Sequence, residues 1–387
     1  MGSRTARLGR RPVLDGLRGI AVLLVLGVHL SLIGQGYVGV DIFFVLSSFL
    51  ITVLLLEEHE RIGAMSLPRF YDGRARRLLP ALATLLVAFT MLCVIVDPYP
   101  SMWPLGRVLL TTSTFANNWV ATLAGGRGQV LGPLSPTWTL AEEVQFYAIW
   151  PLALWLALRL RVSEPKLLLL VVGICAASLV SAQYLRDAYP VYNGYTSPLD
   201  RASELLLGCA VALIWRNGWA SRPLRFTAAR WIAAAGLAFV IAYPGLGERF
   251  SYLSAALLSG LLIVNLLSTD EHEPGQRGPA PTRRAGRPVL SRVVSSRPLR
   301  YTGKLSYGIY LYHLPVYYLL WHYLPGRSHV LYAPIVLVAT FALAAASWRA
   351  IESPIYRRRP GSSHQGSPRA RLQTRRLRST LEPRPTT

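Results

Sequence analysis

Long apolar runs alternate with short polar stretches along almost the whole chain. Ten of these runs approach or reach the roughly 17–25 residues needed to cross a bilayer core. They lie at 13–33, 38–56, 78–97, 143–160, 166–183, 201–216, 229–244, 250–267, 303–323 and 330–350. A weaker run at 108–123 is expected to be re-entrant or interfacial. The pattern predicts an all-α, polytopic membrane bundle of about ten transmembrane helices.

The charge distribution agrees with this interpretation. The 387 residues are 52% hydrophobic and only 16% charged, whereas about a quarter of a soluble domain is charged. If the N-terminus is cytoplasmic, the cytoplasmic loops and tails hold 33 Lys and Arg residues and the opposite side holds 6. This asymmetry follows the positive-inside rule. It predicts a multi-pass plasma-membrane protein with both termini in the cytoplasm, and it attributes the net charge of +22 to topology and lipid contact rather than to nucleic-acid binding.

One membrane domain is expected, over residues 13–352, after a cytoplasmic N-terminal segment at 1–12. Within it, 268–300 is rich in Pro, Gly and Arg, which is typical of a flexible cytoplasmic loop. The stretch 353–387 is basic and too polar to pack, so it is expected to be a disordered cytoplasmic tail.

Besides Asp15 near its start, two ionisable side chains interrupt the first apolar run. Arg18 and His29 are eleven residues apart, so on a helix they lie within about 20° of one face and roughly 16 Å apart along the axis. Such groups are costly in a membrane unless they face protein or a water-filled cavity, and Gly16, Gly19 and Gly27 would let helices approach closely. We therefore expect a wet cavity on this face. An interfacial anchor at Arg18 and an interhelical hydrogen bond at His29 are the alternative.

The second run carries a carboxylate, Asp41, just inside its start. Hydrogen bonding to His29 would raise the basicity of the free imidazole nitrogen. A helix cap is an equally acceptable role for Asp41.

A basic cluster, Arg74, Arg76 and Arg77, precedes the third run. Arg74 and Arg77 share a helix face at i, i+3 and could together clamp a phosphate or pyrophosphate. A positive-inside anchor accounts equally well for the cluster.

At the start of the fourth run, Glu142 and Glu143 could simply favour the helix macrodipole. However, Glu143 and Tyr147 are at i, i+4 and close to Trp138, which favours a lined pocket.

The ninth run adds Ser306, Tyr307, Tyr310 and His313. Aromatic residues are common at membrane interfaces, and His313 is expected to be structural rather than catalytic.

Seven collinear blocks, covering residues 14 to about 359, resemble the acyltransferase-3 family of integral-membrane O-acyltransferases. The blocks are LDGLRGIAVLLVLGVHL, GYVGVDIFFVLSSFLI, FYDGRARRLLPAL, WTLAEEVQFYAIWP, LDRASELLLGCAVAL, LSYGIYLYHLPV and SWRAIESPIYRRR. The resemblance implies about ten spans, an acyl-CoA donor that reaches a central pore from the cytoplasm, and transfer to a hydroxyl group, usually on a sugar.

The family's R-x10-H signature falls on Arg18 and His29, and its R-x-x-R signature on Arg74 and Arg77. Its Trp…Glu…Tyr block falls on Trp138, Glu143 and Tyr147. From the residues and the resemblance together we expect these site residues: catalytic His29, Asp41 and Glu143; acyl-CoA-binding Arg18, Arg74 and Arg77; pocket-lining Trp138, Tyr147, Arg201, Tyr307 and His313.

The chain departs from the family pattern at two positions. Ser47-Ser48 stands where the second block usually reads Ser-Gly, and Pro136 stands where many envelope-modifying members carry a His. A fused extracytoplasmic hydrolase-like domain, which many envelope-glycan modifiers have, is not expected either. The build therefore resembles the antibiotic-tailoring branch, which suggests a macrolide-type or sugar hydroxyl as acceptor; a cell-envelope glycan is the alternative.

The expected chemistry needs a base, because a hydroxyl is a poor nucleophile near neutral pH. His29 would take its proton during attack on the thioester, with Asp41 or Glu143 orienting the imidazole. No metal and no tightly bound cofactor are expected, since these residues lack ligand spacing; acyl-CoA would be a co-substrate. The expected partners are acyl-CoA, the hydroxylated acceptor and the bilayer. The competing interpretation is a transporter that uses the same buried ionisable side chains as a substrate or proton pathway.

Overall fold

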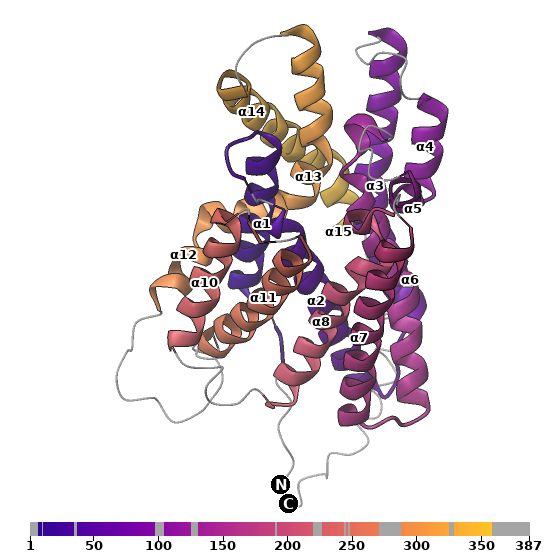
Figure 1. Cartoon of the computed structure of the whole chain (residues 1–387), viewed down its shortest axis with the longest axis vertical. Helices are drawn as coiled ribbons and strands as arrows, with labels where there is room; N and C mark the ends of the chain where they lie inside the picture. The colour runs from indigo at the N-terminus through magenta and orange to yellow at the C-terminus, as the bar shows by residue number, and fades with distance from the viewer. Residues whose placement is uncertain are drawn as a thin grey trace, which may run out of the picture.

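A computed structural model describes residues 7–9, 11–34, 37–96, 104–124, 131–189, 192–219, 227–243, 245–246, 248–270, 288–324 and 329–357. Within these ranges every regular element is helical, which confirms the all-α prediction (Figure 1). The elements are α1 (Pro12–His29), α2 (Val38–Ile62), α3 (Leu67–Ile95), α4 (Leu105–Ser113), α5 (Asn117–Leu123), η2 (Gly132–Leu134), α6 (Thr137–Arg159), α7 (Glu164–Ala188), η3 (Gly194–Thr196), α8 (Pro198–Arg216), α10 (Thr227–Ala242), α11 (Glu248–Asp270), α12 (Val289–Val294), α13 (Arg297–Tyr323), α14 (His329–Ser347), η4 (Trp348–Glu352) and α15 (Ser353–Arg357).

Each of the ten predicted runs overlaps one helix. Among the described residues, six helical segments are long and apolar enough to cross a membrane by themselves: Pro12–His29, Val38–Ile62, Leu67–Ile95, Glu164–Ala188, Phe250–Ser268 and Tyr332–Tyr356. Apolar side chains on α7 point outward, and Leu169 and Val180 are 72% and 69% exposed, as expected of a lipid-facing surface. The chain is a helical membrane bundle, and the exact count of ten spans stays a prediction. The weaker run at 108–123 forms parts of α4 and α5, which are too short to span.

The first and ninth runs pack backbone against backbone. A Cβ atom added at Gly19 would meet the backbone of α13 at Leu299 and Gly303, and one added at Gly303 would meet the Asp15 carbonyl of α1. Figure 1 shows these two helices side by side in the upper middle of the molecule. This close approach, typical of small residues in membrane bundles, brings the polar faces of α1 and α13 together.

The Ser47-Ser48 departure has a structural explanation in the packing of α2 against α8. Ser48 is fully buried, and its hydroxyl donates to the Phe44 carbonyl one turn earlier on α2, at 2.8 Å. The facing residue is Gly208, where any Cβ would collide with the Ser48 hydroxyl and the Val45 carbonyl. The glycine on α8 therefore makes room for the extra hydroxyl on α2.

Three helices begin six or more residues before the corresponding apolar runs. Helix α3 starts at Leu67, α6 at Thr137 and α13 at Arg297. The expected flexible loop 268–300 is helical at both described ends, since α11 continues to Asp270 and Val289–Val294 forms α12; residues 271–287 lie outside the described part. The expected disordered tail is helical through Arg357, and residues 358–387 lie outside the described residues.

Candidate functional site

Three cavities follow one another through the bundle and share lining residues. We call them the vestibule, of about 680 Å³, the throat, of about 50 Å³, and the chamber, of about 260 Å³. Arg18 and Tyr307 line both the vestibule and the throat. Val40 and Tyr310 line both the throat and the chamber. The three cavities are therefore adjacent and in this order, and we call the series the passage; Arg18 lies between the vestibule and the throat, and His29 lies in the wall of the chamber.

The vestibule is strongly basic. Six cationic side chains line it, against two carboxylates, Asp15 and Glu352. The cations come from α1, α3 and α13 and are Arg18, Arg76, Arg77, Arg297, Arg300 and Lys304. The charge of the vestibule is thus suited to an anion that carries several charges.

Only part of the predicted arginine clamp faces the vestibule. Arg77 lines it, whereas the Arg74 guanidinium lies over two aromatic rings, 5.4 Å from the centroid of Phe70 and 5.6 Å from that of Tyr147. Arg76 is paired with Asp72 at 2.8 Å. Arg77 therefore lines the vestibule, whereas Arg74 lies against the two aromatic rings and is not among the lining residues.

The throat contains the second predicted carboxylate. Glu143 lines it and accepts a hydrogen bond from the Tyr147 hydroxyl at 2.9 Å. That hydroxyl also lies 2.5 Å from the Ser47 hydroxyl. Because α6 begins at Thr137, Glu143 lies in the second turn, so the macrodipole explanation does not hold. Its neighbour Glu142 is buried on another side, where it accepts a hydrogen bond from α5 at Asn118, at 2.8 Å.

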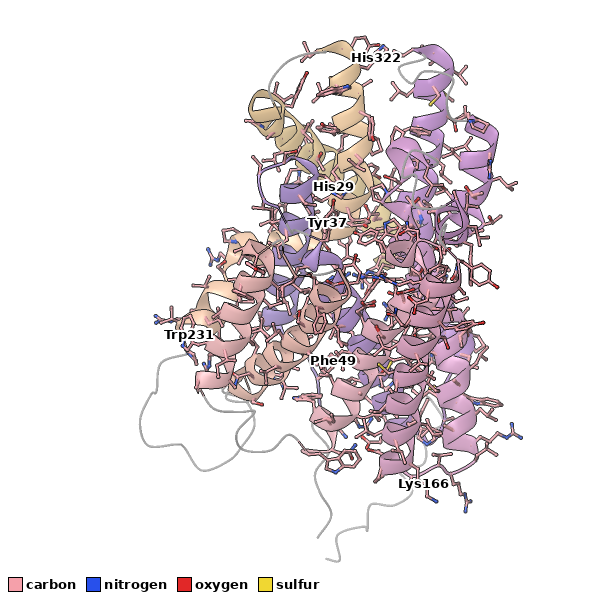
Figure 2. The ribbon with its side chains drawn as sticks, viewed as in Figure 1. His29, Tyr37, Phe49, Lys166, Trp231 and His322 are labelled. Carbon is pink, nitrogen blue, oxygen red and sulfur yellow. The ribbon has the colours of Figure 1, made fainter. Side chains whose placement is uncertain are left out.

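The chamber is lined by aromatic rings around His29. Figure 2 shows His29 and Tyr37 close together in the middle of the molecule, and their ring centroids are 6.4 Å apart. Trp138, Tyr195 and the edge of Tyr310 complete the aromatic wall, and polar groups come from η3 and from the turn before α6. A ring-shaped polar molecule of modest size fits such a wall.

His313 is the hydrogen-bonding partner of His29. The His313 Nε2 atom lies 3.3 Å from the His29 Nδ1 atom, and the His313 Nδ1 atom lies 2.6 Å from the Tyr310 carbonyl oxygen. The His29 Nδ1 atom also lies 2.9 Å from the Val25 carbonyl oxygen. Carbonyl oxygens only accept, so both imidazoles carry their proton on Nδ1. This assignment leaves the Nε2 lone pair of His29 free for a substrate.

Asp41 has a different partner from the one predicted. It is 1% exposed and accepts a hydrogen bond from the Arg201 guanidinium at 2.5 Å, and it makes no side-chain cap. Arg201 is 0% exposed and also lies 3.4 Å from Glu204. The predicted pairing of Asp41 with His29 is therefore wrong: Arg201, on α8, provides the positive charge that a buried carboxylate requires.

Arg201 supports the chamber wall from behind. Its guanidinium carbon lies 4.4 Å from the Tyr252 ring centroid and within 5.7 Å of the centroids of two chamber-lining rings, Trp138 and Tyr195. Of the residues predicted to line a pocket, Trp138 lines the chamber and Tyr307 lines the throat and the vestibule. Three others line none of the three cavities and instead contact residues that do: Tyr147, Arg201 and His313.

Sequence reasoning missed the contribution of α13 to the vestibule. Arg297, Arg300 and Lys304 were assigned to a flexible loop or to the start of a span. Their spacing of three and four residues, which puts all three on one helical face, was the available signal. No group of three or more His, Cys, Asp or Glu side chains arranged to hold a metal ion occurs among the described residues.

Comparisons with known proteins identify the family of this chain. A family model described as "Acyltransferase domain", of the acyltransferase-3 type, matches residues 11–349. The peptidoglycan O-acetyltransferase OatA of Listeria monocytogenes is 34% identical over 371 residues, which cover 91% of this chain and 57% of that protein. The O-acetyltransferase OatA of Staphylococcus aureus is 27% identical over 359 residues, which cover 89% of this chain and 57% of that protein. The chain therefore spans little more than half the length of these relatives.

No solved structure matches the chain. The family model, however, covers most of the sequence and includes the helices that form the vestibule, the throat and the chamber. This chain belongs to the acyltransferase-3 family.

Proposed function

We propose that this protein transfers an acyl group from acyl-CoA to a hydroxyl group of a cell-envelope glycan. The observation that carries the proposal is the series of adjacent cavities, which leads from a basic vestibule to an imidazole with a free nitrogen. The vestibule is lined by helix ends that the positive-inside pattern assigns to the cytoplasm, where acyl-CoA is available. The chamber is lined by segments that the same pattern assigns to the opposite side.

The dimensions of the passage suit the donor. Arg18 and His29 are separated by eleven residues of α1, or about 16 Å along the helix axis. The phosphopantetheine arm of CoA contains about a dozen bonds between its phosphate oxygen and its sulfur, so ordinary bond lengths give it a reach of roughly 15 Å. With its pyrophosphate at Arg18 and Arg77, the donor would extend through the throat and present its thioester beside His29.

The proposed reaction uses His29 as a general base. Its Nε2 atom takes the proton of the acceptor hydroxyl while the hydroxyl oxygen attacks the thioester carbonyl carbon. The carbon–sulfur bond then breaks, the ester forms, and the imidazolium returns the proton to the sulfur of CoA. His313 is proposed to hold His29 in the reactive tautomer. Glu143 is proposed to stabilise the cations around the throat rather than to contact the imidazole.

A cell-envelope glycan is the better-supported acceptor. The named relatives are O-acetyltransferases, and that of Listeria monocytogenes acts on peptidoglycan by its printed name. These relatives favour the glycan alternative over the macrolide-type acceptor suggested by the sequence. The aromatic chamber also suits a sugar, because the apolar face of a pyranose packs well on aromatic rings while its hydroxyls hydrogen-bond to the polar groups between them.

An assay with radiolabelled acetyl-CoA tests both the proposed donor and the proposed acceptor. Purified protein in lipid nanodiscs would be mixed with labelled acetyl-CoA and with either peptidoglycan fragments or a macrolide. We expect label on the glycan as an alkali-labile ester, together with one free CoA thiol for each ester. Label on the macrolide alone would overturn the proposed acceptor, and no CoA release with any hydroxylated acceptor would overturn the proposed donor.

A further inference from the structure

We infer that the first two turns of α13 form the subsite for the 3′-phosphoadenosine end of the donor; this inference rests on the proposed use of acyl-CoA. The residues concerned are Arg297, Arg300 and Lys304, which line the vestibule from a single helix. Their i, i+3 and i+7 positions give them one shared face. The R-x-x-R signature lies on another helix, α3, so these cations are a separate contribution.

The positions of these three cations along α13 assign them to the end of the ligand that lies farthest from the throat. Tyr307, which reaches the throat, continues the same face three residues after Lys304. Arg300 and Arg297 precede Tyr307 by seven and ten residues, or roughly 10 and 15 Å along the axis. A pyrophosphate held beside the throat, where the Arg18 side chain and Tyr307 both line the cavity, would lie inward of Arg297 and Arg300 along this axis. The 3′-phosphate of the ribose is the remaining charged group of CoA.

None of the three cations forms a salt bridge with a residue in the described part of the chain. By contrast, Arg76 on α3 is paired with the Asp72 carboxylate. The Arg300 Nε atom is buried without a hydrogen-bond partner. Apart from Arg76, the other five cations of the vestibule share two lining carboxylates, Asp15 and Glu352. This excess of positive charge favours the binding of an anion from outside the chain.

Aromatic groups beside these cations point to a nucleotide rather than to a simple anion. The Lys304 ammonium lies 5.0 Å from the Trp348 ring centroid, and both side chains line the vestibule together with Tyr301. Exposed aromatic rings among basic side chains bind nucleobases by stacking while the cations hold phosphates. A lipid headgroup offers a phosphate too, but it has no flat ring to stack.

The test compares CoA with 3′-dephospho-CoA by calorimetric titration of the protein in nanodiscs made of neutral lipid. The unaltered protein should bind CoA about 10- to 100-fold more tightly, as expected for charge-assisted hydrogen bonds to one phosphate. The R297A/R300A double variant should lose most of this preference and bind 3′-dephospho-CoA as the unaltered protein does. Arg292→Ala is the matched control, because Arg292 is exposed on α12 and does not line the vestibule.

The contrary outcomes distinguish failure of the α13 subsite from failure of the proposed donor. A double variant that keeps the full preference for CoA would overturn the α13 subsite and leave the donor intact. Equal binding of the two ligands by the unaltered protein, with both weakened by phosphatidylglycerol in the nanodisc, would assign the cations to a lipid phosphate. If the unaltered protein binds neither ligand, acyl-CoA is not the donor and the proposed function itself fails.

Discussion

Replacing His29 by alanine should reduce acyl transfer by about 10²–10⁴-fold, the range that general base catalysis contributes. The imidazole lines the chamber with a free Nε2 atom, and among the described residues that line the chamber no other is a histidine or a carboxylate. Binding of CoA should be nearly unchanged, because the phosphates are held about 16 Å away. The measurement combines turnover of labelled acetyl-CoA with equilibrium binding of CoA to the same variant.

Two other histidines supply the controls. His322, at the far end of α13, is exposed and lines none of the three cavities, so His322→Ala should retain full activity. His313→Gln keeps an acceptor for the His29 Nδ1 proton and should retain more kcat than His313→Ala, with the same KM for acyl-CoA. Full activity in His29→Ala would remove this residue from the mechanism, and equal kcat in the two His313 variants would remove its positioning role.

Replacing Arg201 by leucine should lower the free energy of unfolding by about 3–5 kcal/mol, as found when one partner of a buried ion pair is removed. The guanidinium is 0% exposed and contacts two carboxylates, Asp41 at 2.5 Å and Glu204 at 3.4 Å. Its loss leaves both without their counter-charge, and the rings of the chamber wall lose the cation they surround. Reversible unfolding in detergent micelles measures the difference.

Arg69 provides the matched control for this effect. Its side chain is 69% exposed and pairs with Glu58 at 3.0 Å, a surface arrangement worth about 0–1 kcal/mol. Arg69→Leu should therefore unfold almost as the unaltered protein does. If Arg201→Leu proved equally stable, the buried pair would not support the chamber, and the pairing of Asp41 with His29 would have to be reconsidered.

The helices were predictable because the membrane demands long, uninterrupted apolar runs, and each predicted run overlaps a helix. Their starts were less predictable. Helix α13 begins with Arg297, and α3 carries Arg74 and Arg77, in basic stretches that hydropathy alone assigns to loops. Arginine has a good helix propensity, so a basic stretch next to a span can continue the helix.

The pairs of side chains in the site were harder to predict because they depend on helix packing. Asp41 and Arg201 are 160 residues apart, and His29 and His313 are 284 apart. Residues on neighbouring spans were the natural candidates for partners, which explains the incorrect pairing of Asp41 with His29. One signal was available: the glycines at Gly19 and Gly303 could have indicated that α1 and α13 touch.

The most direct test of the passage is an experimental structure with CoA bound. The account predicts phosphates at Arg18 and Arg77, the pantetheine arm in the throat between Glu143 and Tyr310, and the sulfur within about 4 Å of His29 Nε2, close to the separation of reacting atoms in a near-attack geometry. A CoA molecule whose sulfur stays in the vestibule, or whose nucleotide lies at the chamber, would contradict it.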